Sequence, residues 1–214
     1  IGMAYHEILQ RFFEKDQEDF SWERLKGITG KVLEGKDLEF PSMKRQIMDK
    51  AFSDFERYQK EHLPGEPSSS KMETDFKFDL GGNEMRGRID QINIEHDGSM
   101  ELVDFKSGTT RYSEHDLEDE IQLKIYRLAM DEDSRLRQLK VRDVKMKYLS
   151  LGSQKKAEFF LPEGYYDREK LIKRLKEIIS GIKSERFRAE PDSYNTCNYC
   201  DFEIVCPKYY GKYD

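Results

Sequence analysis

The middle of the chain alternates apolar and polar side chains with a period of two, the pattern of strands that bury one face. Glycine and asparagine residues separate several of these segments, as turns require. The strands that the pattern predicts are residues 72–80, 86–94, 100–106, 141–151 and 156–161. Because helical patterns lie before, between and after them, the sequence predicts an α/β fold in which a central sheet is flanked by helices.

Apolar residues at helical spacing predict helices over residues 1–13, 42–63, 116–130 and 166–182. Residues 20–35 are ambiguous, because Gly27 and Gly30 weaken a helix there. Ser42, directly after Pro41, is the expected N-cap of its helix. Residues 64–70 have the composition of a linker.

The helix predicted over residues 116–130 has its apolar stripe at Leu117, Ile121, Ile125 and Leu128. Gln122 and Tyr126 are four residues apart, so they project together from the flank of that stripe. Alone, this pair is typical of a solvated glutamine beside a partly buried tyrosine. Following two strands that carry acidic residues, it becomes a candidate for chemistry.

The loop between two predicted strands decides whether the carboxylates of Asp90 and Asp104 can meet. Asp97-Gly98 is a strong hairpin signal between them. A two-residue turn would set Phe105 opposite Asp90 and place the two carboxylates on opposite faces. A three-residue loop, His96–Gly98 with its glycine in the left-handed conformation, sets Asp90 opposite Asp104. We therefore predict a bulged hairpin between the two acids.

The composition fits one sizeable domain, or a domain with an appended subdomain, of 214 residues. Only 36% of the residues are hydrophobic, but 12% are aromatic, so bulky side chains supply much of the core. No apolar run approaches the roughly 20 residues that span a bilayer, and no signal peptide is present. We expect a cytoplasmic protein that does not bind membranes. Because the chain starts at Ile1, we expect a fragment of a longer protein.

The charge is unevenly distributed. The net charge of −6 argues against indiscriminate binding of nucleic acid. Residues 135–188, however, hold 16 Lys and Arg against 7 Asp and Glu. This segment is either a surface that faces phosphates or a set of solvated strand and helix faces, and the sequence leaves both alternatives open.

Two predicted strands each carry an acidic and a basic side chain two residues apart, Arg88 with Asp90 and Asp104 with Lys106. In the strand over residues 100–106, Asp104 and Lys106 share a face, roughly 7 Å apart. Asp90 and Asp104 offer the hard oxygen ligands that Mg²⁺ or Mn²⁺ prefers. The alternative is a set of exposed ion pairs, Asp104 with Lys106 or Asp90 with Arg88, which contribute at most about 1 kcal/mol each.

Gly87-Arg-Ile-Asp90, Asp104-Phe-Lys106 and Gln122-x-x-x-Tyr126 resemble the successive motifs of RecB-like nucleases, within the PD-(D/E)XK (restriction-endonuclease-like) superfamily. Gly2-x-x-x-His6 resembles the upstream histidine motif of that family. The resemblance implies a mixed sheet flanked by helices, in a single domain over residues 1–214. Its parts would be a helical region (1–63) with the histidine motif, a catalytic α/β core (71–190) and a Cys-rich segment (191–214).

The resemblance also implies roles for individual residues. His6 would join Asp90 and Asp104 as a metal ligand, and Lys106 would orient or deprotonate the attacking water. Gln122 would position water or phosphate, and Tyr126 would contact the DNA backbone. Glu73 is a secondary candidate, because related nucleases often carry an acidic residue at this place. For Glu73 an exposed strand position is the alternative.

All three cysteines lie within ten positions, at Cys197, Cys200 and Cys206. In a chain without secretory features, this spacing indicates a metal knuckle more than a disulfide framework. It is similar to the C-terminal cysteines that hold a [4Fe-4S] cluster in RecB-like nucleases such as AddB-type subunits. Their fourth cysteine lies upstream of the histidine motif, and here it is expected before Ile1. A zinc site that uses a histidine such as His62, or three inert cysteines, are the alternatives.

The sequence therefore predicts an Mg²⁺- or Mn²⁺-dependent deoxyribonuclease that hydrolyses phosphodiester bonds. From the resemblance we expect an exonuclease domain of a helicase-nuclease that processes DNA double-strand breaks, with DNA and a helicase domain or subunit as partners. The alternative is a catalytically silent DNA-binding or scaffold domain with the same fold.

Overall fold

A computed structural model describes residues 2–14, 19–36, 40–63, 69–108, 113–139, 143–153, 157–186, 197, 200–202 and 205–206. Most of the predicted linker, residues 64–68, lies outside the described residues, and Ser69 and Ser70 belong to the first strand. The chain divides into two compact units, Ile1–Leu171 and Ile172–Asp214. The first unit contains the sheet and the helices on its two faces, and a single nuclease domain over residues 1–214 stays a prediction.

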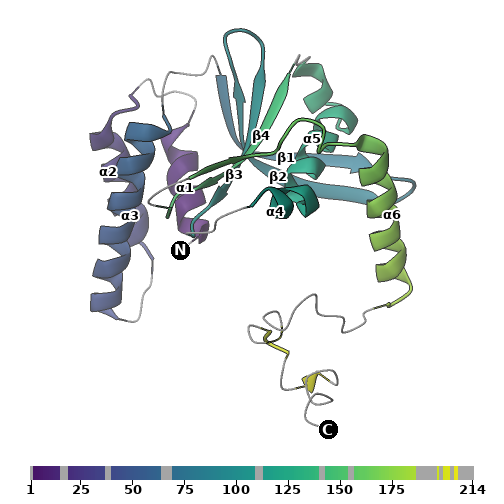
Figure 1. The fold of residues 1–214 in the computed structure, drawn as a ribbon. Coiled ribbons are helices and arrows are strands. Elements are labelled where there is room, and N and C mark those ends of the chain that lie inside the picture. Colours follow the sequence, from purple (N-terminus) through teal and green to yellow (C-terminus); the bar gives the residue numbers. More distant parts are fainter. Residues whose placement is uncertain are drawn as a thin grey trace. The chain divides into compact units, whose positions relative to one another are not determined.

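Five strands form one sheet in the order β1-β2-β3-β4-β5 (Figure 1). They are β1 (Ser69–Asp79), β2 (Glu84–Ile94), β3 (Met100–Lys106), β4 (Val144–Ser150) and β5 (Glu158–Phe160). β3 and β4 are parallel, and the other neighbouring pairs are antiparallel. This confirms the predicted mixed sheet. The parallel pair needs a crossover connection, which α4 (Glu114–Asp119) and α5 (Gln122–Glu132) supply between β3 and β4.

The register between β2 and β3 is the one that a three-residue loop predicts. The pairs run from Gln91 opposite Val103 to Ile94 opposite Met100. Extending this register by one residue sets Asp90 opposite Asp104. The two carboxylates therefore leave neighbouring strands at the same level, which a two-residue turn would have prevented.

The loop itself has the predicted bulged geometry. The Glu95 N–H donates to the Ser99 carbonyl at 2.9 Å, and the Gly98 N–H donates to the Glu95 carbonyl at 3.0 Å. Gly98 has a φ of +83°, which a side chain would strain. The bulged hairpin between the two acids is thus confirmed.

β1 and β2 form a long antiparallel hairpin in one register, from Ser69 opposite Ile94 to Asp79 opposite Glu84. The register sets Glu73 opposite Asp90, but the ladder is interrupted at this level, and Glu73 has a φ of +47°. A turn closes the hairpin as predicted, with the Leu80 N–H donating to the Asn83 carbonyl at 2.8 Å.

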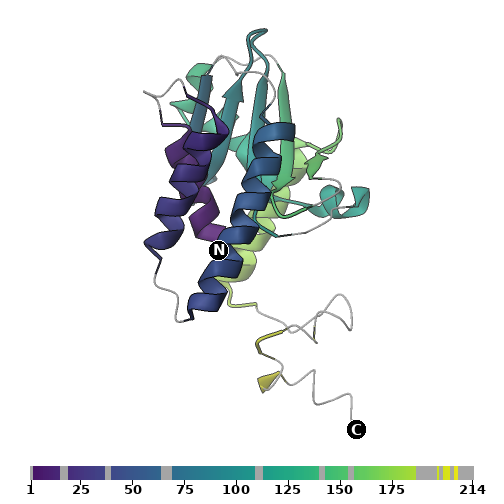
Figure 2. The same ribbon diagram turned by 90° about the vertical axis from the view of Figure 1, so that its left-hand side faces the viewer.

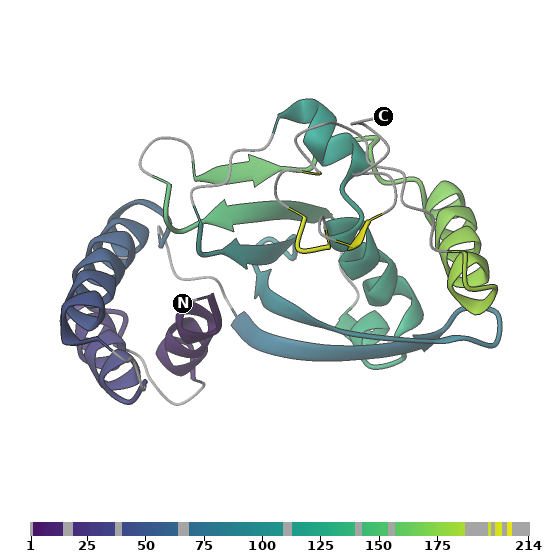
Figure 3. The ribbon, with the colours of Figure 1, turned by 90° about the horizontal axis from the view of Figure 1, so that it is seen from below.

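Three helices cover one face of the sheet: α1 (Gly2–Phe12), α2 (Trp22–Glu34) and α3 (Pro41–Glu61). Figure 2 shows them in front of the strands, and Figure 3 shows them gathered on one side of the sheet. Val103 and Phe105 of β3 point into this layer. The buried core there includes Ile8, Leu9, Phe12, Leu25, Leu33, Phe55, Tyr58, Val103, Phe105 and Leu149.

The starts of α2 and α3 settle two sequence expectations. Residues 22–34 are helical despite their glycines, because Leu25, Val32 and Leu33 are buried and the Ser21 side chain accepts from the Arg24 N–H. The prediction that Ser42 is the N-cap of its helix was wrong. Phe40 is the N-cap residue and Pro41 occupies the first turn, where its missing N–H costs nothing.

The other face of the sheet is covered by α5 (Gln122–Glu132), which contacts β1, β3 and β4. The prediction of one continuous helix over residues 116–130 was wrong, because α4 (Glu114–Asp119) and α5 are separate helices. Glu120 is extended there, and its carboxylate accepts from the Ile121 and Gln122 N–H groups. The buried side of α5 consequently uses Leu123, Tyr126, Leu128, Ala129 and Met130.

The remaining elements are a short 3₁₀ helix, η1 (Leu136–Leu139), and α6 (Arg168–Lys183), in which the boundary between the two units falls. Among the described residues, no helix combines the length and the apolar character that crossing a membrane requires.

Candidate functional site

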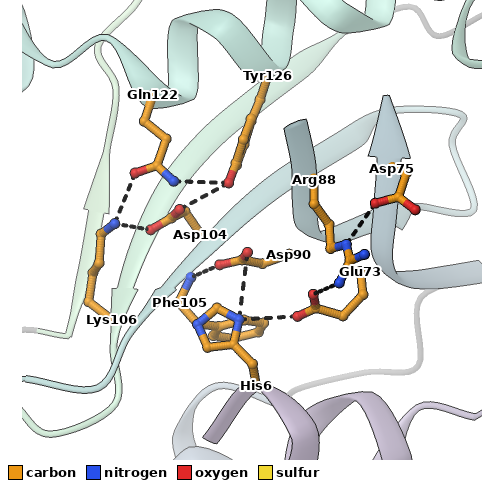
Figure 4. Close-up of polar contacts among 10 residues, drawn as sticks. All are labelled: His6, Glu73, Asp75, Arg88, Asp90, Asp104, Phe105, Lys106, Gln122 and Tyr126. Atoms are coloured by element: carbon orange, nitrogen blue, oxygen red, sulfur yellow. Dashed lines mark hydrogen bonds and ion pairs between the residues drawn. The ribbon is translucent and has the colours of Figure 1, made fainter. Parts of the chain in front are cut away.

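Three carboxylates lie at one level across three adjacent strands. Glu73 comes from β1, Asp90 from β2 and Asp104 from β3, and the two registers described above set each opposite the next. Figure 4 shows His6 of α1 on one side of this row, and Gln122 and Tyr126 of α5 on the other. The hairpin registers thus bring Asp90 and Asp104, and the secondary candidate Glu73, to one level of the sheet.

His6 joins the row through Glu73 and Asp90. Its Nδ1 lies 3.1 Å from Glu73 Oε1 and 3.6 Å from Asp90 Oδ1. Ligand atoms of these three residues all lie within 4.8 Å of one another. One imidazole nitrogen and two carboxylates are a donor set for a divalent cation, so the residues fit the predicted Mg²⁺ or Mn²⁺.

His6 is held in place by the core contacts of its helix. Tyr5, Ile8 and Leu9 are buried, so α1 is anchored on both sides of the histidine. The Tyr5 hydroxyl also donates to Asp54 Oδ2 of α3 at 2.8 Å. Burial, followed by the hydrogen bond to Asp54, raises the pKa of Tyr5 well above its ordinary value, so it stays a neutral donor.

Glu73 is not the exposed strand residue that the alternative interpretation proposed. Only 13% of its side chain is exposed, and it contacts both His6 and Arg88. Its left-handed backbone costs a residue with a side chain about 1–2 kcal/mol. Strain of this kind persists where the surroundings impose it, here at the level where the β1–β2 ladder is interrupted.

Asp104, Lys106, Gln122 and Tyr126 form a closed ring of polar contacts. Lys106 Nζ lies 2.6 Å from Asp104 Oδ2 and donates to Gln122 Oε1 at 3.0 Å. Gln122 Nε2 donates to the Tyr126 hydroxyl at 3.0 Å, and that hydroxyl donates to Asp104 Oδ1 at 3.2 Å. The predicted residues of β3 and α5 are therefore brought together, with the lysine ammonium in a fixed position.

Asp90 links the two halves of the site. Its Oδ2 accepts from the Phe105 N–H at 2.8 Å, and its Oδ1 faces His6. Asp90 therefore bridges α1 and β3 from its place on β2.

The two aspartates are buried close together, at 8% and 1% exposure for Asp90 and Asp104. Burial, followed by the charge of Asp104, raises the pKa of Asp90 to about 6. Burial also raises the pKa of Asp104, although Lys106 opposes the shift. A divalent cation would relieve this cost, because it offsets both negative charges. Burial, then the charge of Asp104, raises the pKa of Tyr126, which therefore remains protonated.

The ion-pair alternative is only partly correct. Asp104 does pair with Lys106, but the aspartate is buried rather than on an exposed face. Arg88 pairs with Asp75 and Glu73, and not with Asp90. The register of the β1–β2 hairpin, which sets Asp75 opposite Arg88, is the signal that the sequence analysis did not use.

Sequence reasoning also missed the residues that support the segment after Lys106. The Leu151 N–H donates to the Lys106 carbonyl at 2.8 Å, and Ser150 Oγ donates to the Gly108 carbonyl at 2.6 Å. A Cβ on Gly152 would lie 2.7 Å from the same Gly108 oxygen. Gly152, which lies between the strands predicted over residues 141–151 and 156–161, was the available signal.

The three cysteines are free thiols and are partly buried. The Cys200 N–H donates to the Cys197 carbonyl at 3.2 Å. Three thiols are one fewer than the four ligands that an all-cysteine cluster needs.

His62, the other residue considered with the cysteines, lies just after α3. Its Nδ1 is 3.8 Å from Glu158 Oε2 of β5, and burial lowers its pKa.

Lys147, within the basic segment 135–188, is also buried and pairs with Glu101 and Glu158. That lysine is therefore neither part of a phosphate-facing surface nor on a solvated face.

The family model of the PD-(D/E)XK nuclease superfamily matches residues 1–207. A solved structure titled "Crystal structure of SSO0001" is similar to this chain at a TM-score of 0.43 and 16% sequence identity, over 97% of this chain and 98% of that chain. A comparison with curated proteins gave no match. The family match extends over both the sheet and the candidate site, and the mixed sheet flanked by helices is consistent with a restriction-endonuclease-like fold. The chain therefore belongs to the PD-(D/E)XK nuclease superfamily, whose members are typically metal-dependent nucleases.

Proposed function

We propose that the protein is a metal-dependent deoxyribonuclease that hydrolyses phosphodiester bonds at the row of Glu73, Asp90 and Asp104. One observation carries the proposal: the β2–β3 register brings Asp90 level with Asp104, between His6 on one side and Lys106 on the other. Superfamily membership supports the same chemistry.

Mg²⁺ or Mn²⁺ would bind at His6, Glu73 and Asp90, whose ligand atoms all lie within 4.8 Å of one another. Asp104, the ligand that the sequence predicts beside His6 and Asp90, is outside that group and contacts Lys106 and Tyr126 instead. When bound, a divalent cation polarises a phosphoryl oxygen and lowers the pKa of water. The Phe105 N–H holds one Asp90 oxygen, so the other remains directed toward His6.

Phosphodiester cleavage adds negative charge to a centre that already repels nucleophiles, so a fixed positive charge is needed beside it. Lys106 would supply this charge and would hold the attacking water, because Asp104 and Gln122 fix its ammonium group. Tyr126 is only 4% exposed and contacts Asp104 and Gln122. Its proposed role is therefore to position these two side chains, rather than to contact the DNA backbone directly.

We further propose that the chain is an exonuclease domain of the RecB-like, AddB-type branch, which acts with a helicase domain or subunit at DNA double-strand breaks. The order of its motifs, from Gly2-x-x-x-His6 to Gln122-x-x-x-Tyr126, supports this narrower assignment. Cys197, Cys200 and Cys206 would bind a [4Fe-4S] cluster together with a fourth cysteine. Iron and sulfide analysis after anaerobic purification of the longer protein tests the cluster, and metal-free protein with intact thiols would reject it.

The function is tested with end-labelled linear DNA, single-stranded and double-stranded, incubated with Mg²⁺, Mn²⁺ or EDTA. We expect cleavage with either cation, none in EDTA, and none by the Asp104→Asn variant. Closed circular DNA separates exonuclease from endonuclease action, because only an endonuclease cuts it. DNA binding without cleavage under every condition would reject the nuclease and favour the silent scaffold.

A further inference from the structure

Arg88 lies beside the carboxylate row and is largely accessible. It is two residues before Asp90 on β2, directly opposite Asp75 of β1. Arg88 Nε donates to Asp75 Oδ1 at 2.7 Å, and Nη1 lies 3.6 Å from Glu73 Oε2. The side chain is 56% exposed, compared with 29% for Lys106.

The position of Arg88 gives it access to a DNA strand at the site. Residues two apart on a strand share a face and are about 7 Å apart, so the guanidinium group projects beside the Asp90 carboxylate. A guanidinium has five N–H donors, and its contacts within the described part of the chain use only Nε and Nη1. Donors on Nη2 thus remain for a planar anionic partner.

The acidic surroundings require such a group. Glu73, Asp75, Asp90 and Asp104 would repel a polyanion that approaches the site, and Lys106 is already engaged with Asp104 and Gln122. His6, Glu73 and Asp90 would hold a divalent cation that offsets charge at the cleaved phosphate. The neighbouring phosphate of the same strand needs a separate cation, and arginine matches phosphate geometry better than lysine does.

We propose that Arg88 binds the backbone phosphate next to the one that is cleaved and so sets the position of the DNA strand on the carboxylate row. Asp75 holds the guanidinium group until DNA arrives. Because Asp75 is 66% exposed, its ion pair is weakly stabilising and is readily exchanged for a phosphate. The inference rests on the proposed function for the location of the strand, but DNA binding alone can test it.

Arg86 provides a matched control. It lies two residues earlier on β2, is 70% exposed and pairs with Glu84, farther from the carboxylate row. We compare wild type, Arg88→Ala, Arg86→Ala and Asp75→Asn for binding to a fluorescent single-stranded oligonucleotide by anisotropy, over a series of salt concentrations. Circular dichroism confirms that each variant is folded.

Arg88→Ala is expected to weaken binding about tenfold, the effect of losing one charge-assisted contact. The slope of log K against log salt should become less steep by about 0.7, the value for one phosphate contact on single-stranded DNA. Arg86→Ala should change binding less than about twofold. Asp75→Asn should tighten binding, because it removes the competitor for Arg88.

A neutral methylphosphonate placed at successive positions of the oligonucleotide locates the contact. In wild type, a methylphosphonate next to the cleaved bond should weaken binding about tenfold. In Arg88→Ala, a methylphosphonate at that position should leave binding unchanged, whereas at the other positions the variant should respond as wild type does. Equal losses for Arg88→Ala and Arg86→Ala, or unchanged sensitivity in Arg88→Ala, would overturn the inference. Absent cleavage by wild type would instead reject the proposed function, while the binding differences would still decide the role of Arg88.

Discussion

Lys106 and Asp104 lie two residues apart on one face of β3, with Nζ 2.6 Å from Oδ2, and the aspartate of this pair is almost fully buried. The distance between an acid and a base of this kind does not by itself distinguish a structural ion pair from a catalytic pair. The contacts of Lys106 with Gln122, and of Asp104 with Tyr126, show that α5 fixes both groups. Four predictions follow from this arrangement and its surroundings.

Lys106→Ala should reduce cleavage by at least about 100-fold, because the fixed charge beside the phosphate is lost. DNA binding should stay within about threefold of wild type, since the role proposed for Lys106 is in the transition state. Single-turnover cleavage and anisotropy measure the two quantities. Lys124→Ala, which removes a lysine that contacts the Glu118 carbonyl, is the control. Cleavage at the wild-type rate by Lys106→Ala would exclude the proposed role.

The metal-free protein should lose stability as the pH rises from about 4 to about 6. The pKa of Asp90 is raised to about 6, above its value near 4 in the unfolded chain. Stability from its protonated form is therefore complete below pH 4 and is lost as the pH passes 6, by up to about 3 kcal/mol. Urea unfolding in EDTA measures this, and the difference between wild type and Asp90→Asn isolates it. A difference that does not change with pH would contradict the prediction.

Glu73→Gly should be more stable than Glu73→Ala by about 1 kcal/mol, because glycine adopts a φ of +47° without strain. Both variants lack the carboxylate, so their difference reports the backbone alone. The same pair of substitutions at Thr74, where φ is not positive, should give the opposite order, because glycine weakens a strand. Thermal unfolding measures both pairs. If the glycine and alanine variants had the same order of stability at both positions, the backbone of Glu73 would not be strained.

Gly152→Ala should destabilise the protein by about 1–3 kcal/mol, because its Cβ would lie 2.7 Å and 2.9 Å from the carbonyl oxygens of Gly108 and Ser107. These are backbone atoms directly after Lys106, so cleavage should fall as well. Gly27→Ala in α2, where nothing lies within 4 Å, should be neutral or stabilising by up to about 1 kcal/mol. Denaturant unfolding measures the free energy of unfolding of both variants. Similar values for Gly152→Ala and Gly27→Ala would refute the prediction.

The sequence was sufficient to predict the β2–β3 register, because the loop length and the requirement that Asp90 meet Asp104 leave one solution. Local signals of this kind depend on a few neighbouring residues. The break between α4 and α5 could not be predicted from periodicity, since the stripe through Ile121 continues across it. There the Glu120 side chain competes with the helix for the backbone N–H groups.

The surroundings of Glu73 and Arg88 depend on tertiary contacts. An alternating strand pattern predicts Glu73 on a solvated face, but α1 places His6 against it. Neither the burial of Glu73 nor its left-handed backbone has a signature in its neighbouring residues. The partner of Arg88 is different, because the β1–β2 register that sets it opposite Asp75 follows from the length of the turn between the two strands.

The contributing segments lie far apart in the chain. The β2–β3 hairpin brings Asp90, Asp104 and Lys106 together within seventeen positions, so this half needs only local pairing and can form early during folding. His6 and Gln122 arrive only when α1 and α5 have docked on opposite faces. During synthesis the candidate site is therefore incomplete until residue 126 has emerged and α5 has packed, and the site is disrupted whenever α1 or α5 undocks.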